Sequence, residues 1–207
     1  SVGITRRAFV SALGKPKPID VHLWQLRDFA EGNYKRVDDR PFGGGPGMVM
    51  LAEPLSACLA AIKQARKATP DKASTNALDK PTSVVLFSPI GQTIHQTVIE
   101  KWADPQGELG DGAILICGRY EGLDQRFIDT HVTHQLSLGD FVLSGGEIAA
   151  VAFLDAIARL QTGVLTDEQS HIQDSFNPAL GGLLDHPHYT RPEVWNGDSV
   201  PEVLMSR

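Results

Sequence analysis

The sequence has no run of eighteen apolar residues and no visible signal peptide, although the chain does not begin with methionine. Because a membrane-spanning helix needs about 20 predominantly apolar residues, we expect no membrane segment and a cytoplasmic protein. Only two cysteines occur in 207 residues, Cys58 and Cys117, and both lie inside apolar segments. They indicate buried thiols of a reducing compartment, which excludes a disulfide framework and a cysteine metal site.

The chain also lacks an excess of positive charge and several familiar catalytic motifs. Its formal net charge of −6 argues against a nucleic-acid partner, since phosphate binding usually leaves a basic surface. No GxSxG, CxxC or Ser/His/Asp spacing stands out, and the stretch Gly43–Gly47 lacks the lysine and hydroxyl of a P-loop. His186 and His188 form a His-x-His pair without a partner carboxylate pattern, so we expect no metal site.

The apolar segments that are present predict an α/β protein with a largely parallel sheet. Short aliphatic runs without charge, at Ser83–Phe87 and Ala113–Cys117, are typical of buried parallel strands, and Val21–Leu26 alternates like a half-buried strand. Apolar residues at helical spacing predict helices over 54–67, 92–103 and 147–160.

Turns that contain glycine follow the strand ends at Phe87, at Cys117 and near Leu138. Glycine lets a backbone approach a ligand closely, and ligands of open α/β sheets bind beyond the carboxyl ends of the strands. If these strands are neighbours in the sheet, their turns form one ligand site.

The helix predicted over 147–160 has almost no polar face. Since a helix that is apolar all round is normally buried, we predict that it packs against a second copy in a homodimer. Asp155 and Arg159 are four residues apart and could pair on its surface, which leaves both a structural and a functional interpretation of Arg159 open.

The composition changes after Gln161, where proline, glycine and acidic residues become frequent and apolar clusters become rare. This composition indicates a linker with docking segments more than an independent core. We therefore predict one domain over residues 1–161 and a linker region over residues 162–207.

Six sequence motifs occur along the chain in an order that can be compared with known families. They are Arg40–Met48 (RPFGGGPGM), Ser88-Pro89-x-Gly91, Cys117–Gly122 (CGRYEG), Ser137–Glu147 (SLGDFVLSGGE), Asp174–Phe176 (DSF) and Pro187–Pro192 (PHYTRP). In this order they resemble the bacterial tRNA (guanine-N1)-methyltransferase family, TrmD, and the resemblance runs in register from about Gly3 to Leu204.

The resemblance implies a SPOUT-class fold. Such a fold is an open parallel sheet with a deep C-terminal trefoil knot, followed here by a linker and a truncated helical C-terminal domain. Sequence rules alone would not predict a knot, because true knots are nearly absent from proteins. The resemblance also implies S-adenosylmethionine as methyl donor, N1 of guanosine 37 in tRNA as acceptor, and a homodimer whose active site is shared between subunits. It leaves a Mg²⁺ requirement open.

By the same resemblance, three knot loops hold the cofactor, chiefly through backbone hydrogen bonds to adenine. The implied cofactor-binding residues are Ser88, Pro89, Gly91, Gly118, Tyr120, Gly122, Ser137, Leu138, Gly139, Asp140, Phe141, Val142, Leu143, Gly145 and Gly146.

The resemblance also assigns catalytic roles to particular residues. Guanine N1 carries a proton at neutral pH, so methyl transfer needs a base, which is Asp174 from the other subunit. Arg159 would stabilise the negative charge that develops on guanine O6, and Glu121 would position substrate or cofactor. Spacing alone would favour a helix cap or a solvated linker acid at Asp174. The implied RNA-binding residues are Arg40, Gly44, Gly45, Arg119, His188, Tyr189 and Arg191.

The sequence departs from the family at both ends and at two internal positions. The family has a strand ahead of Ser1 and a basic helical domain after the segment Val203–Ser206, so we expect a truncated chain, which would account for the charge of −6. Ala149 stands where many members have proline, and Ile90 stands where glutamine is usual. Two alternatives stay open: a SPOUT enzyme for another RNA base, and a catalytically silent dimer that binds S-adenosylmethionine and RNA.

Overall fold

The computed structural model describes residues 6–10, 18–68, 82–104, 112–165, 175–177 and 181–205. These residues belong to two compact units, one within residues 1–168 and one within residues 169–207. The first unit includes Val164, which lies beyond the predicted boundary at residue 161 and is buried against Ala8 and Ala158. Among the described helices, none is long and apolar enough to cross a membrane.

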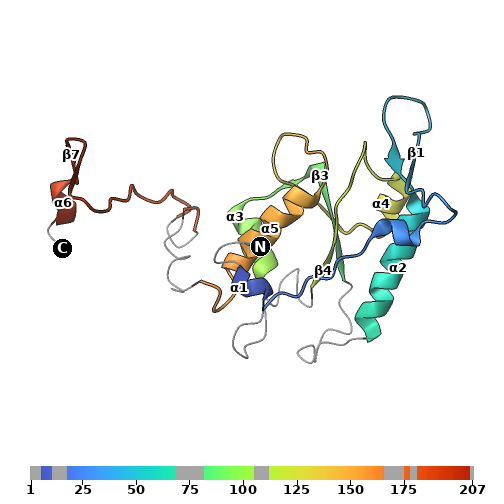
Figure 1. Ribbon diagram of the computed structural model, residues 1–207, viewed down its shortest axis with the longest axis horizontal. Coiled ribbons are helices and arrows are strands. Elements are labelled where there is room, and N and C mark those ends of the chain that lie inside the picture. The colour runs from blue at the N-terminus through green and yellow to red at the C-terminus, as the bar shows by residue number, and fades with distance from the viewer. Residues whose placement is uncertain are drawn as a thin grey trace. The chain divides into compact units, whose positions relative to one another are not determined.

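A parallel three-stranded sheet forms the centre of the first unit (Figure 1). Its strands are β4 (Ala113–Ile116), β3 (Ser83–Thr93) and β5 (His134–Ser137), in that order, and β3 pairs with both neighbours in parallel. The aliphatic side chains of β3 are buried from Val84 to Phe87, as expected for a strand covered on both faces. The predicted α/β class with a parallel sheet is confirmed.

Helices cover both faces of this sheet (Figure 1). One face carries α3 (Gln96–Ala103) and α5 (Glu147–Arg159), and the other carries α2 (Ala52–Ala68) and α4 (Gln125–His131). On the first face, the ring of Phe153 makes edge contacts with Phe87 and Trp102, at centroid distances of 5.7 and 5.6 Å. Truncating a buried ring of this kind costs about 3–5 kcal/mol, so this packing fixes α5 on the sheet.

The strand predicted over Ser83–Phe87 is longer than expected, because β3 continues past the turn at residues 88–91. Phe87 and Gln92 both lie opposite Leu136 of β5, and the residues between them bulge out of the sheet. A Cβ atom on Gly91 would lie 2.5 Å from the backbone of Gln135 and Leu136, so only glycine lets the strand return to β5 here. The helix that follows therefore begins at Gln96 and not at Gln92.

The strand predicted over Val21–Leu26 is wrong. Residues 21–25 have no regular structure and are exposed, and a short 3₁₀ helix, η1, spans Leu26–Phe29. The alternating pattern was present, but no described strand lies beside this segment to complete its hydrogen bonds.

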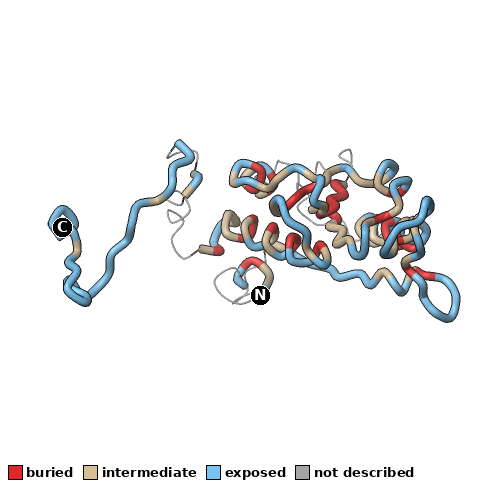
Figure 2. Tube along the Cα trace, turned by 90° about the horizontal axis from the view of Figure 1, so that it is seen from above, coloured by how far each residue is buried: buried red, intermediate tan, exposed pale blue. Residues whose placement is uncertain are grey.

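The remaining elements of the two units are short. The first unit contains α1 (Arg6–Phe9) and the antiparallel pair β1 (Asp38–Asp39) and β2 (Val49–Met50). The second contains a hairpin of β6 (Val194–Trp195) and β7 (Asp198–Ser199), then α6 (Glu202–Met205). The hairpin turns through Asn196-Gly197, both with positive φ, as a two-residue turn requires. No described residue from 175 to 205 is buried (Figure 2).

Candidate active site

Three loops meet at the carboxyl edge of the sheet: loop 88–91 within β3, loop 118–122 after β4, and loop 137–146 between β5 and α5. The strands are parallel, so their carboxyl ends lie at the same edge. Loops 118–122 and 137–146 touch directly, because the Gly146 amide donates to the Gly118 carbonyl oxygen at 2.9 Å. The Ile94 amide, just after loop 88–91, donates to the Ser137 carbonyl oxygen at 2.9 Å. The structure therefore gathers all three glycine-bearing turns.

Gly146 permits the close approach of loop 137–146 to loop 118–122. A Cβ atom at this position would lie 2.9 Å from Cα of Cys117 and 3.1 Å from the Gly118 nitrogen. These are backbone atoms, which cannot move aside as a flexible side chain would. Any larger residue would therefore separate loop 137–146 from loop 118–122.

An ion pair between Arg119 and Glu147 links the same two loops at their surface. Both Nε and Nη2 of Arg119 lie 2.8 Å from Glu147 Oε1, and about half of each side chain is exposed. Arg119 is a predicted RNA-binding residue, whereas the sequence predicts no role for Glu147. An acidic residue in the first turn of a helix is favourable for the helix dipole, but only the fold shows which cation it meets.

The Cys117 thiol beneath this ion pair is not activated as a nucleophile. Burial and then the nearby Glu147 carboxylate, against the smaller opposing effect of Arg119, together raise the pKa of Cys117 to about 11. At neutral pH the thiol is therefore protonated. Cys117 is half-buried and packs against the core, short of the full burial predicted from the sequence.

Loop 118–122 rests on the segment that ends the glycine-rich stretch. The Glu121 amide donates to the Met48 carbonyl oxygen at 2.9 Å, and the Met50 amide donates to the Gly122 carbonyl oxygen at 2.8 Å. The Glu121 side chain covers Gly47 so closely that a Cβ atom there would collide with it. These contacts hold Glu121 next to the glycine-rich stretch.

The predicted RNA-binding residues of the first unit, Arg40, Gly44, Gly45 and Arg119, are all exposed. Gly44 and Gly45 have positive φ and no neighbouring atom in the space that a Cβ would take, so their backbone is open to a partner. Arg40 follows β1 and is exposed, and its amide donates to the Asp39 carboxylate at 2.8 Å. The cation and the open glycine backbone are thus adjacent along one loop.

The three loops also carry apolar side chains suited to a flat aromatic ligand. Leu138 and Leu143 pack onto the core, while Ile90, Tyr120, Phe141 and Val142 are exposed. Ser137 Oγ accepts from the Gly139 amide and donates to the Gly139 carbonyl oxygen, which fixes the first turn of loop 137–146. Nearby on β5, Gln135 Oε1 is buried without a hydrogen-bond partner. Such an arrangement can bind a heteroaromatic ring between apolar walls and backbone groups.

The other predicted catalytic residues are placed less completely. Arg159 is the last residue of α5 and is half-buried. It therefore lies at the opposite end of the helix from loop 137–146, which directly precedes α5. Asp174 lies outside the described residues. His188, Tyr189 and Arg191 belong to the second unit and are exposed.

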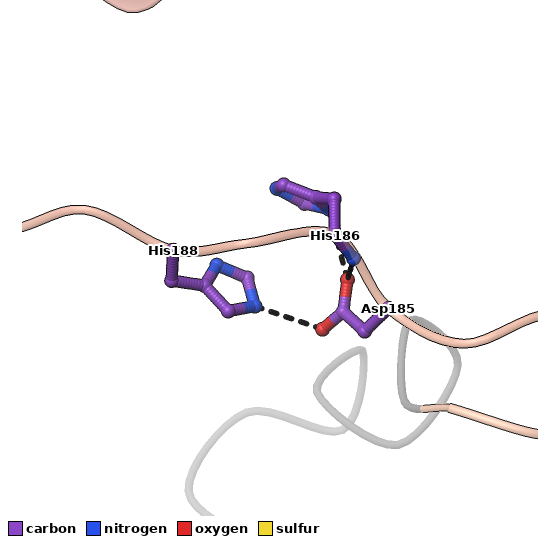
Figure 3. A group of neighbouring side chains, drawn as sticks. All are labelled: Asp185, His186 and His188. Atoms are coloured by element: carbon purple, nitrogen blue, oxygen red, sulfur yellow. Dashed lines mark hydrogen bonds and ion pairs between the residues drawn. The ribbon is translucent and has the colours of Figure 1, made fainter. Parts of the chain in front are cut away.

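The prediction that His186 and His188 lack a carboxylate partner is wrong. Asp185, directly before them, lies 2.9 Å from His186 Nδ1 through Oδ1 and 2.8 Å from His188 Nε2 through Oδ2 (Figure 3). The hydrogen bond from His188, followed by that from the His186 amide, lowers the pKa of Asp185. The adjacent acid was visible in the sequence, but its contact with both rings depends on the local backbone.

Comparison with known proteins places these loops in a family. The family model described as tRNA (Guanine-1)-methyltransferase TrmD matches residues 2–207. Proteins named tRNA (guanine-N(1)-)-methyltransferase are similar to this chain over almost all of its length. That of Albidiferax ferrireducens is 62% identical over 204 residues, covering 99% of this chain and 73% of the relative. That of Polaromonas sp. is 60% identical, covering 99% and 72%, and that of Herminiimonas arsenicoxydans is 48% identical, covering 98% and 73%.

Proposed function

Because this chain belongs to the tRNA (guanine-1)-methyltransferase family TrmD, we propose that it transfers a methyl group from S-adenosylmethionine to N1 of guanosine 37 in tRNA. The observation that carries the proposal is the family match over residues 2–207, which includes all three loops at the carboxyl edge of the sheet. The sequence similarity is therefore not confined to the scaffold but covers the proposed site.

We extend the proposal to the SPOUT fold with its deep trefoil knot. The tight contacts of Gly146 with Cys117, and of Gly91 with β5, support loops that are threaded closely together. Residues 162–207 would then be the linker and the start of a helical tRNA-binding domain. The absence of any buried residue among those described from 175 to 205 supports a linker.

Loops 88–91, 118–122 and 137–146 would hold S-adenosylmethionine. When bound, it supplies an electrophilic methyl group. The apolar side chains of Leu138 and Leu143 would face the adenine ring, and backbone groups of these loops would hydrogen-bond its edge. Gln135 Oε1 is buried close to loop 88–91 without a hydrogen-bond partner, which supports a ligand that carries a polar group at this position.

The proposed chemistry needs a base and a stabiliser of negative charge. Asp174 of the partner subunit would accept the N1 proton of guanine, which makes that nitrogen nucleophilic. The Arg159 guanidinium would donate hydrogen bonds to O6 as charge develops there. Glu121, held against Gly47 and Met48, would position the base. Arg40, Gly44, Gly45 and Arg119, with His188, Tyr189 and Arg191, would contact the RNA.

A homodimer is part of this proposal, because Asp174 would act on the site of the other copy. The exposed side of α5 supports such an interface: Ile148 is 58% and Val151 is 66% exposed in the single chain. Apolar side chains on a helix normally face a partner surface, and a second copy of α5 would cover them. We also propose a cytoplasmic location, where tRNA is available.

The test is methyl transfer from labelled S-adenosylmethionine to two tRNA transcripts that differ only at position 37, G in one and A in the other. We expect label only on the G37 transcript, mapped to N1. Label on both transcripts would indicate another target base, and cofactor binding without label would indicate a silent binding protein. Parallel reactions with MgCl₂ and with EDTA decide whether transfer requires Mg²⁺.

A further inference from the structure

Three side chains of the second unit converge on one point, outside the proposed active-site loops (Figure 3). Potential ligand atoms of Asp185, His186 and His188 all lie within 4.8 Å of one another. The two imidazole rings lie side by side, with centroids 4.5 Å apart, and each turns a ring nitrogen toward a different oxygen of the Asp185 carboxylate. Two imidazoles and a carboxylate therefore face one another without an intervening side chain.

The local backbone holds this group together. The Asp185 amide donates to Ser175 Oγ at 2.9 Å, which ties residue 185 to a segment ten residues earlier. The His186 amide donates to Asp185 Oδ1 at 2.7 Å, which fixes the carboxylate over the following peptide. Pro187 stands between the two histidines, and its ring restricts the backbone on both sides. The three side chains therefore do not need a large backbone change to share a ligand.

The donor set selects the chemical class of that ligand. Imidazole nitrogen with carboxylate oxygen suits Zn²⁺ and related transition metals, whereas Mg²⁺ and Ca²⁺ prefer oxygen ligands alone. Zn²⁺ binds such atoms at about 2.0–2.2 Å, so small rotations of these exposed or half-buried side chains would bring all three into range. Three protein ligands leave a fourth position for water or for a group of a partner.

We propose that Asp185, His186 and His188 form a binding site for a divalent cation of the Zn²⁺ class. The segment around them supports this, because none of the residues described from 175 to 205 is buried and a metal ion can order a segment that has no core of its own. The proposal stands on this cluster and does not depend on the proposed methyl transfer.

The test uses the full chain, with any affinity tag removed, titrated with Co²⁺ as a spectroscopic probe and then with Zn²⁺ as competitor. We expect one saturable Co²⁺ site per chain, displaced by Zn²⁺. The single substitutions His186→Gln and His188→Gln should each weaken binding by at least about tenfold. The matched control is His22→Gln, because His22 also lies beside a carboxylate, that of Asp20 at 3.3 Å, but this pair belongs to no group of three potential ligands among the described residues. The control should bind like the unmodified chain.

A second measurement covers the case in which a variant does not fold. In the unmodified chain, Zn²⁺ should shift the ring-nitrogen NMR signals of His186 and His188 and leave those of His22 unchanged. The proposal would be overturned by the absence of a saturable Co²⁺ signal or by equal Co²⁺ affinity in His188→Gln and the unmodified chain. It would also be overturned if the ring-nitrogen signals of His186 and His188 did not shift with Zn²⁺.

Discussion

Proton removal from guanine depends on one residue in the proposed mechanism, Asp174. Its carboxylate would take the N1 proton, whereas the amide of asparagine has similar size and cannot act as a base at neutral pH. We expect Asp174→Asn to lower the rate of methyl transfer by about 10²–10⁴-fold, the usual contribution of a general base. Cofactor affinity should stay near that of the unmodified chain, because the cofactor loops are elsewhere.

Single-turnover transfer to the G37 transcript measures this rate, and isothermal titration calorimetry measures cofactor affinity. Asp167→Asn is the matched control, because it removes an acid from the same part of the sequence. Unchanged transfer by Asp174→Asn would remove this residue from the mechanism.

Individual residues also show where sequence reasoning reached its limit. The strand before Cys117 was predictable, because its residues are uniformly aliphatic, although only Ile114 among them is buried. The partner of Arg119 was not, because Glu147 lies 28 residues away and meets it only through the contact of two loops. The contact of Asp185 with two imidazoles depends in the same way on backbone conformation. Residue types and spacing suggest candidates, but only the folded backbone pairs them.

Among the structural elements, loop 137–146 has a strict steric requirement at its end. Its final residue, Gly146, has helical φ and ψ that alanine also adopts, so Gly146→Ala changes packing and not backbone preference. The added methyl group would meet the Cys117 backbone at 2.9 Å and push the loop away from loop 118–122. Overpacking of this kind costs about 1–3 kcal/mol, so we expect cofactor affinity to fall by roughly 10- to 100-fold.

Calorimetric titration with S-adenosylmethionine measures this loss, and thermal unfolding of the free protein separates it from global instability. Ser144→Ala is the control, because Ser144 is exposed on the same loop and its substitution adds no atom. Affinity within about twofold of the unmodified chain would show that the close contact of the two loops is not needed for binding.

The elements of the first unit were predictable to different degrees. Charge-free aliphatic runs predicted β3 and β4, and periodic apolar residues predicted α2, α3 and α5, because these patterns reflect burial directly. The continuation of β3 to Thr93 was missed, since it depends on the approach of Gly91 to another strand. The segment Val21–Leu26 shows the reverse error, in which a local pattern lacks the neighbouring strand that a sheet requires.

At the scale of the whole molecule, the proposed mechanism requires two copies of the chain. The sequence of α5 predicted this, because apolar residues surround the helix, and the exposed Ile148 and Val151 leave an uncovered apolar surface in one copy. The second unit carries the segment that follows Asp174, whereas the cofactor loops belong to the first unit. The central claim is therefore a methyl-transfer site made from the loops of one subunit and Asp174 of the other.

The most direct measurement of that claim combines two defective subunits. Asp174→Asn and Gly146→Ala chains are expressed together with different tags and purified as the mixed dimer. Transfer is measured at a cofactor concentration well below the dissociation constant of the Gly146→Ala chain, at which each homodimer has little activity. One of its two sites then contains intact loops and an intact Asp174, so we expect about half of the unmodified rate of transfer to G37 tRNA. A mixed dimer no more active than its two parents would contradict the shared site.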